Sequence, residues 1–216
     1  MNLFGEAWDN YEARIAQDWN AKVGANDVGV IAGDISWAMR MADTVKDFEY
    51  LGKLNGTKII IRGNHDYWRQ SITKIRGILP PGVVALQNDS IRIGGVVFSG
   101  TRGWRVLERH QRPQPEDIKI FDREVARFEL SLKDAREKMQ DGDKLVAILH
   151  YPPFNSTRQD SPFTILCEKY GVDVCVYGHL HGKSGRHEPM HVRNGVRYYL
   201  TSCDLLGFSV AEIPMS

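Results

Sequence analysis

The stretch "TKIIIRGNHDYWR", residues 57–69, runs an apolar segment directly into Gly63, Asn64, His65 and Asp66. The apolar part is typical of a buried strand, whereas the residues after it are seldom found in a core. In α/β proteins, ligands gather beyond the carboxyl ends of the strands. The stretch therefore predicts a strand that delivers polar side chains to a site.

The same pattern recurs along the chain. Asp34 follows "VGVIAG", His150 follows "LVAIL", and His179 and His181 follow "DVCVYG". Counting His65, four of the seven histidines in the chain thus lie just past the carboxyl end of an apolar strand. Imidazole, carboxylate and amide oxygen without thiolate predict a site for manganese, iron, zinc or cobalt. Two such ions can clamp a phosphoryl group.

Each residue alone has a simpler interpretation. Asp34 could cap a helix, Asn64 and His65 could close an ordinary turn, and His150 could be a buried histidine bonded to a backbone carbonyl. The "GHLHG" at 178–182 favours ligands, because side chains one residue apart on extended backbone point the same way. The simpler interpretations would have to hold independently at four strand ends, so the four together favour a shared site.

Hydrophobic periodicity predicts an α/β fold in one domain, residues 1–216. Gly94 and Gly95 predict a hairpin turn. The predicted helices cover 6–23, 41–54, 68–79 and about 115–139. The predicted strands cover 27–34, 57–63, 83–86, 90–95, 96–100, 144–150, 172–179, 196–202 and 208–213.

Composition argues against several function classes. Lys and Arg total 28 against 27 for Asp and Glu, so a net charge of +1 gives no strong nucleic-acid signal. There is neither an apolar run long enough to span a membrane nor a leader-like N-terminus, which predicts a cytoplasmic protein. Three cysteines without CxxC spacing predict neither a disulfide framework nor a thiolate zinc site.

Four motifs together resemble the calcineurin-like metallophosphoesterases: "GDISW", "GNHD", "LHYPP" and "GHLHG", in the order found in that family. "GTRGW" and "SPFTILCEKYGVDVCVYGHLHG" resemble a bacterial branch described as predicted phosphohydrolases. The resemblance implies a four-layer α/β/β/α sandwich with two divalent transition-metal ions, Mn²⁺, Fe or Zn²⁺, at its edge.

The resemblance also implies a role for each ligand. Asp34 would bridge both ions, while Asn64, His150 and His179 would complete the second metal site and His181 would bind the first.

The catalytic roles follow from the same resemblance. His65 would stand near the leaving-group oxygen as a proton donor or an electrostatic stabiliser, with Asp66 as a candidate to orient it. A metal-bound hydroxide would attack phosphorus in line.

One motif of the family is missing from this sequence. The family begins with a strand that carries Asp-x-His, and this chain opens on "MNLFGEAWDNYEAR". The first metal site would keep only Asp34 and His181. We expect that Met1 is an internal methionine of a longer chain, the alternative being a short form with a single metal. Either way, we expect the chain as given to bind close to one ion tightly.

Two loops are candidates to contact the substrate. Residues 100–117 contain Arg102, Trp104 and Arg105, and residues 154–163 contain Asn155 and Arg158. Arginine can pair with phosphate and tryptophan can stack on a ring, although solvated loops are an equal alternative. We expect a small phosphate ester, nucleotides included, with monoester and diester both open. The alternative function is a non-catalytic metal-binding scaffold or protein-interaction module.

Overall fold

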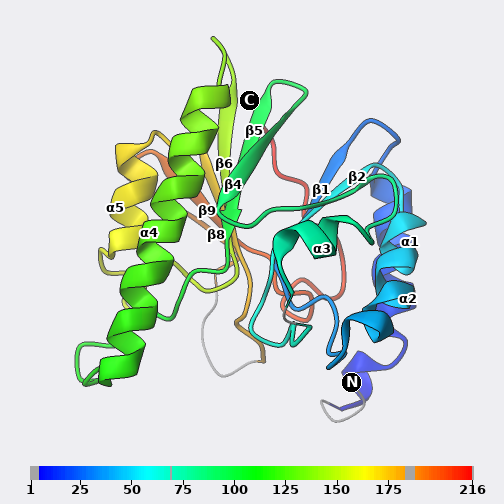
Figure 1. Ribbon diagram of the computed structural model, residues 1–216, viewed down its shortest axis with the longest axis horizontal. Helices are drawn as coiled ribbons and strands as arrows, with labels where there is room; N and C mark the ends of the chain where they lie inside the picture. The colour runs from blue at the N-terminus through cyan, green and yellow to red at the C-terminus, as the bar shows by residue number, and fades with distance from the viewer. Residues whose placement is uncertain (1–4, 69, 183–187, 216) are drawn as a thin grey trace.

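Two β-sheets lie face to face in the computed structural model, which describes residues 5–68, 70–182 and 188–215 (Figure 1). The smaller sheet has the order β1-β2-β3, with all strands parallel. The larger has the order β4-β5-β6-β7-β9-β8, in which β4 and β8 run antiparallel to their neighbours. The strands are β1 (Val28–Ile31), β2 (Thr57–Ile60), β3 (Val83–Ala85), β4 (Asp89–Ile93), β5 (Val96–Thr101), β6 (Lys144–Leu149), β7 (Val174–Tyr177), β8 (Met190–Arg193) and β9 (Val196–Leu200).

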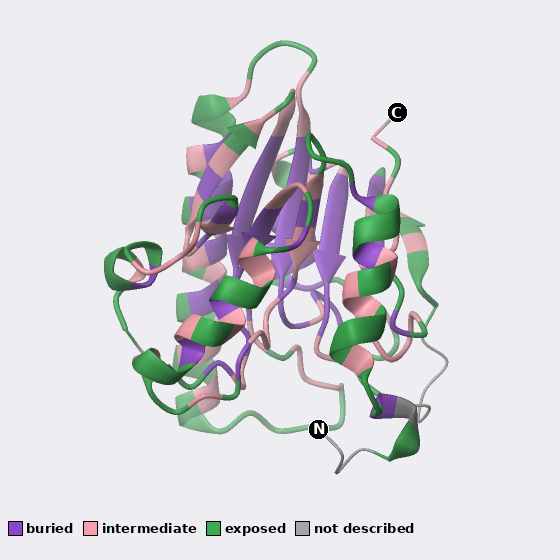
Figure 2. Cartoon of the chain, turned by 90° about the vertical axis from the view of Figure 1, so that its right-hand side faces the viewer, coloured by how far each residue is buried: buried purple, intermediate pink, exposed green. Residues whose placement is uncertain are grey.

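Helices cover the outer face of each sheet, so the predicted α/β class and four-layer α/β/β/α arrangement are confirmed (Figure 1). The helices are a 3₁₀ turn η2 (Glu6–Trp8), α1 (Tyr11–Lys22), α2 (Met41–Gly52) and α3 (Ile72–Arg76) beside the smaller sheet, and α4 (Pro115–Lys138) and α5 (Pro162–Lys169) beside the larger. In Figure 2 the central strands are almost wholly buried, while the helices expose their outer faces. No helix in the described part of the chain has both the length and the apolar character to cross a bilayer.

The space between the sheets is filled by apolar side chains from both. Ile59 and Ile61 of the smaller sheet pack with Phe98, Ile148 and Val176 of the larger, all buried. Strands buried on both faces read as continuous apolar runs, which is why "IIIRG" and "LVAILH" are recognisable in the sequence. This packing holds the carboxyl ends of strands from both sheets at one edge.

The long helix α4 follows from its sequence pattern. Phe121, Val125, Phe128 and Leu132 recur at helical spacing and pack against the larger sheet. Pro115 occupies the first turn, where the missing N–H does no harm. The predicted hairpin at Gly94 and Gly95 is also confirmed, since both have positive φ between paired β4 and β5.

Three predictions of secondary structure need correction. The helix predicted over 6–23 is interrupted at Asn10, whose φ of 52° is left-handed. The strand predicted over 208–213 does not form, because side chains of α1 bind its backbone: Val210 N–H donates to Asp18 Oδ2 at 2.6 Å, and Lys22 Nζ donates to the Val210 carbonyl at 3.1 Å. The helix predicted over 68–79 is shorter, and its Arg69 lies outside the described residues.

Two elements were not predicted. Helix α5 begins at Ser161, whose hydroxyl accepts from the Thr164 amide in a capping box. Strand β8 is an edge strand with alternating exposed residues, joined to β9 by Asn194 and Gly195.

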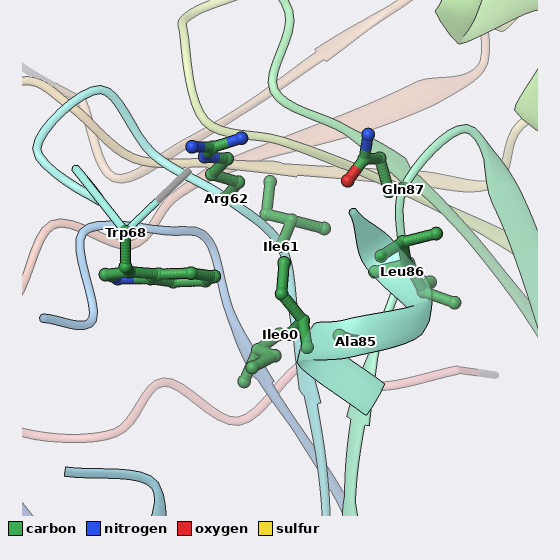
Figure 3. A pocket seen from close by; sticks show the side chains of 9 residues that line it. Ile60, Ile61, Arg62, Trp68, Ala85, Leu86 and Gln87 are labelled. Carbon is green, nitrogen blue, oxygen red and sulfur yellow. The ribbon is translucent and has the colours of Figure 1, made fainter. Parts of the chain in front are cut away.

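A small cavity lies beneath the loop after β2 (Figure 3). Its volume is about 10 Å³, and its lining includes Ile60, Trp68, Ile75 and Ala85. A single water needs roughly 10–15 Å³, so this cavity is a packing gap and not a substrate site.

Candidate metal centre

Two glycines bring the loops after β1 and β2 into contact. A Cβ atom added to Gly63 would lie 2.1 Å from Oδ1 of Asp34, and one added to Gly33 would lie 2.6 Å from the Gly63 nitrogen. No side chain fits at either position, so glycine is required for this approach. The main-chain N–H of His65 then donates to Asp34 Oδ1 at 2.8 Å. The "GD" and "GNHD" motifs therefore form one unit.

Two of the predicted ligands have strained backbones. Asp34 has a φ of 58° and His179 a φ of 71°, in the left-handed region that non-glycine residues seldom adopt. Such strain persists only where the surroundings fix the backbone, and it is found most often at functional sites.

Four predicted ligands converge from the two sheets. Oδ1 of Asn64, after β2, lies 2.6 Å from Nε2 of His150, after β6, and 2.8 Å from Nδ1 of His179, after β7. The two ring nitrogens are 3.2 Å apart. Oδ2 of Asp34, after β1, lies 3.6 Å from His150 Nε2. These are the residues assigned to the second metal site by resemblance.

The protonation of His150 decides how this cluster is held together. Its Nδ1 lies 2.8 Å from the Ala32 carbonyl, which can only accept, so Nδ1 carries the hydrogen. Burial lowers the pKa of His150. Burial, and to a smaller extent the neighbouring His150, lowers the pKa of His179 to about 4. The neutral His150 ring thus turns the lone pair of Nε2 toward the Asn64 amide oxygen.

An imidazole nitrogen and an amide oxygen this close can serve as neighbouring ligands of one cation, and metal-bound histidines commonly donate their other N–H to a backbone carbonyl. Within the described ranges, no three His, Cys, Asp or Glu side chains form a metal cage by themselves. The Asn64 amide oxygen is the shared centre of this cluster. Its nitrogen and oxygen donors fit a divalent transition metal.

The remaining predicted ligand, His181, has a different partner. Its Nδ1 lies 2.7 Å from Asp204 Oδ1, and the Gly182 N–H donates to the other carboxylate oxygen at 2.8 Å. The carboxylate fixes the ring and leaves Nε2 as its available nitrogen. Asp204 was missed by sequence reasoning because it stands four residues beyond β9, although a polar residue after a strand is the signal used elsewhere.

The predicted proton donor His65 stands between two aromatic side chains. Its ring stacks on Trp37 with 4.6 Å between centroids and 15° between planes. Its Nδ1 lies 2.8 Å from the Tyr67 hydroxyl. Tyr67 was not predicted to contact it.

Asp66 was expected to orient His65, but its carboxylate contacts other groups. It is 2% exposed and accepts five hydrogen bonds, and none of them comes from the His65 ring. Burial raises the pKa of the Asp66 carboxyl, which the backbone N–H groups of Ser36 and Gly63 oppose. The carboxylate joins the two motif loops. The five donors are the amides of Asp34, Ile35, Ser36 and Gly63 and the indole Nε1 of Trp68.

Two of the predicted substrate contacts adjoin the cluster. The Arg102 carbonyl accepts from the His150 amide at 3.0 Å, and its guanidinium lies 4.8 Å from the Trp104 ring centroid. Trp104 packs 5.4 Å from Tyr151, whose ring lies 4.3 Å from His179.

The other three are engaged elsewhere. Arg105 pairs with Asp117, and Arg158 lies 2.7 Å from a carboxylate oxygen of Glu188. Asn155 is buried and its amide donates to Gln159. No contact among the described residues joins them to the histidine cluster, and their role in binding substrate stays a prediction.

The fold and the cluster define an α/β protein with a candidate metal centre of nitrogen and oxygen ligands at the common edge of two sheets. The chain belongs to the calcineurin-like phosphoesterase family, whose sequence model matches residues 6–183. Members of this family generally bind divalent metals, and membership supports a general function in hydrolysing phosphoester bonds. A search of curated proteins finds no matching relative. The bacterial branch and the missing first strand stay predictions.

Proposed function

We propose that this chain is a metal-dependent phosphohydrolase that cleaves a small phosphomonoester or phosphodiester. The observation that carries the proposal is the meeting of His150 Nε2, His179 Nδ1 and the Asn64 amide oxygen within 3.2 Å of one another. A divalent ion held by these groups and Asp34 would supply a Lewis acid for the phosphoryl oxygens and a lowered pKa for bound water.

The side chains around the cluster have separate roles in this proposal. Asp34, Asn64, His150 and His179 hold the ion, and the carboxylate of Asp66 keeps their loops together. His65 donates a hydrogen bond or a proton to the leaving-group oxygen and so stabilises its developing charge.

A non-catalytic scaffold is the second candidate, because only Asp34 and His181 of the first metal site are present in this sequence. The placement of His65 favours the enzyme, since a scaffold has no need of an ordered imidazole beside its ion.

An assay with added Mn²⁺ tests the proposal on phenyl phosphate and on diphenyl phosphate. We expect turnover of one ester by the parent chain and a fall of roughly 10²- to 10⁴-fold for His65→Ala, the usual range for a general acid. Glu137→Ala is the control, because Glu137 is exposed on α4 and lies outside both candidate substrate loops. A chain that binds Mn²⁺ but turns over neither ester would support the scaffold.

A further inference from the structure

We propose that Tyr67 is a positioning residue that holds the His65 ring in the tautomer with its hydrogen on Nε2, from which the ring donates a hydrogen bond to the leaving-group oxygen. The use of this N–H on a substrate rests on the proposed function. The tautomer itself does not, because it is a property of the folded chain. The family match assigns no role to Tyr67.

The alternation of side chains explains how Tyr67 reaches the ring. From residue 65 to residue 68, burial alternates: Asp66 and Trp68 are buried, while His65 and Tyr67 lie on the accessible side. The buried pair is joined by the bond from Trp68 Nε1 to Asp66 at 3.2 Å. The accessible pair is joined by the contact between the Tyr67 hydroxyl and His65 Nδ1 at 2.8 Å. One short segment thus anchors itself with one face and arranges the histidine with the other.

The His65 ring is fixed in three directions. Its own backbone N–H donates to Asp34 Oδ1, which sets where the side chain starts. Trp37 covers one ring face in a nearly parallel stack, and the Tyr67 ring stands edge-on at 84°. Trp37 is 44% exposed and Tyr67 37%, so these large aromatic side chains lie at the surface beside the histidine and outside the core.

The direction of the Tyr67 bond sets the tautomer. A phenol O–H is a better donor than an imidazole N–H, and an imidazole lone pair is a better acceptor than a phenol oxygen. Tyr67 therefore donates to Nδ1, and the neutral ring carries its hydrogen on Nε2. No hydrogen bond from the described residues occupies Nε2, which leaves its N–H available to a leaving-group oxygen.

The first experiment measures the tautomer directly. Two-bond ¹H–¹⁵N correlation spectra of ¹⁵N-histidine-labelled chain, with His65 assigned through His65→Gln, distinguish the two tautomers without any substrate. We expect the Nε2–H pattern in the parent chain and a mixture of tautomers in Tyr67→Phe. Tyr50→Phe is the control, because it removes a hydroxyl of similar exposure whose partner is the Glu12 carbonyl. A pattern unchanged in Tyr67→Phe would overturn the proposal.

The second experiment asks whether the positioned N–H is used. Phenolate leaves poorly and depends on a hydrogen bond to its developing charge, whereas 4-nitrophenolate leaves readily. We expect Tyr67→Phe to lower kcat roughly tenfold for phenyl phosphate, within the contribution of one hydrogen bond to a charged group, and to change kcat little for 4-nitrophenyl phosphate. An equal fall for both esters would contradict the positioning role. If the parent hydrolyses neither ester, the proposed function fails, while the spectra still decide the tautomer.

Discussion

Asp66 shows how one side chain can hold a candidate site together without being one of the predicted ligands. Its two oxygens accept from four backbone amides of the loops after β1 and β2. These loops carry Asp34 and Asn64, so the distance between two predicted ligands depends on a third residue. A carboxylate suits this position because it only accepts.

We expect Asp66→Asn to lower the free energy of unfolding by about 2 to 4 kcal/mol, because an amide N–H₂ would face backbone donors in a buried place. The fall should be measured by urea unfolding monitored by circular dichroism. Mn²⁺ affinity should fall with it, since the two loops lose their connection. Asp122→Asn is the control, because that carboxylate is exposed on α4. Equal stability of the Asp66 and Asp122 variants would show that the bonds to Asp66 contribute little.

At the scale of residues, the meeting of four predicted ligands could be anticipated from the sequence, and the residues that support them could not. The sequence pattern identifies these four predicted ligands, because each follows an apolar strand: Asp34, Asn64, His150 and His179. The residues that contact His65 and His181 stand at no fixed separation from them in the sequence. Residues such as Tyr67 and Asp204 are common in loops, so only the folded chain shows which histidine ring each one contacts.

Among the elements, a surface ion pair joins the β4–β5 hairpin to the turn before β6. Arg92 Nε and Nη2 lie 2.7 and 2.9 Å from the two carboxylate oxygens of Asp143. The Arg92 guanidinium, and then the Gln140 backbone N–H, hold the pKa of Asp143 below its ordinary value.

A depressed pKa gives a contribution to stability that depends on pH. In the unfolded chain the Asp143 carboxyl titrates near its ordinary value of about 3.9, and in the folded chain it titrates lower. Its contribution is therefore complete above about pH 5 and is lost as pH falls through the folded pKa. Urea unfolding from pH 7 to pH 2 should show a constant difference between the parent and Asp143→Asn at neutral pH that closes in acid. Asp141→Asn, an exposed neighbour, should show no such closure; a difference that persists at pH 2 would contradict the assignment.

Elements were predictable where periodicity is strong. Helix α4 and strands β2 and β6 each bury a regular apolar pattern, so local sequence and tertiary packing agree. Strand β8 exposes half of its residues and gives a weak pattern, although Asn194 and Gly195 are a hairpin signal. The C-terminal segment has strand-like residues, but the side chains of α1 take its backbone groups. This competition between side chains and strand pairing for the same backbone groups cannot be predicted from local sequence.

The whole molecule explains why the candidate metal centre needs both sheets. Asp34 and Asn64 come from the smaller sheet, and His150 and His179 from the larger, so no single segment carries all four predicted ligands. Packing between the sheets, through residues such as Ile61 and Ile148, fixes the distance between the two pairs. His181 stands apart from the other four in its contacts, since its ring is held by Asp204.

This division leads to a prediction of metal content for a chain of these 216 residues. After loading with Mn²⁺ and gel filtration, mass spectrometry of the metal should find close to one ion per chain, because one complete ligand set is present. His179→Ala should lose the ion, since it removes one of the two imidazoles around Asn64 Oδ1. His181→Ala should keep it, because that ring is bonded to Asp204 outside the set. Two tightly held ions in the parent, or loss of the ion in His181→Ala, would show that the first site has ligands beyond Asp34 and His181.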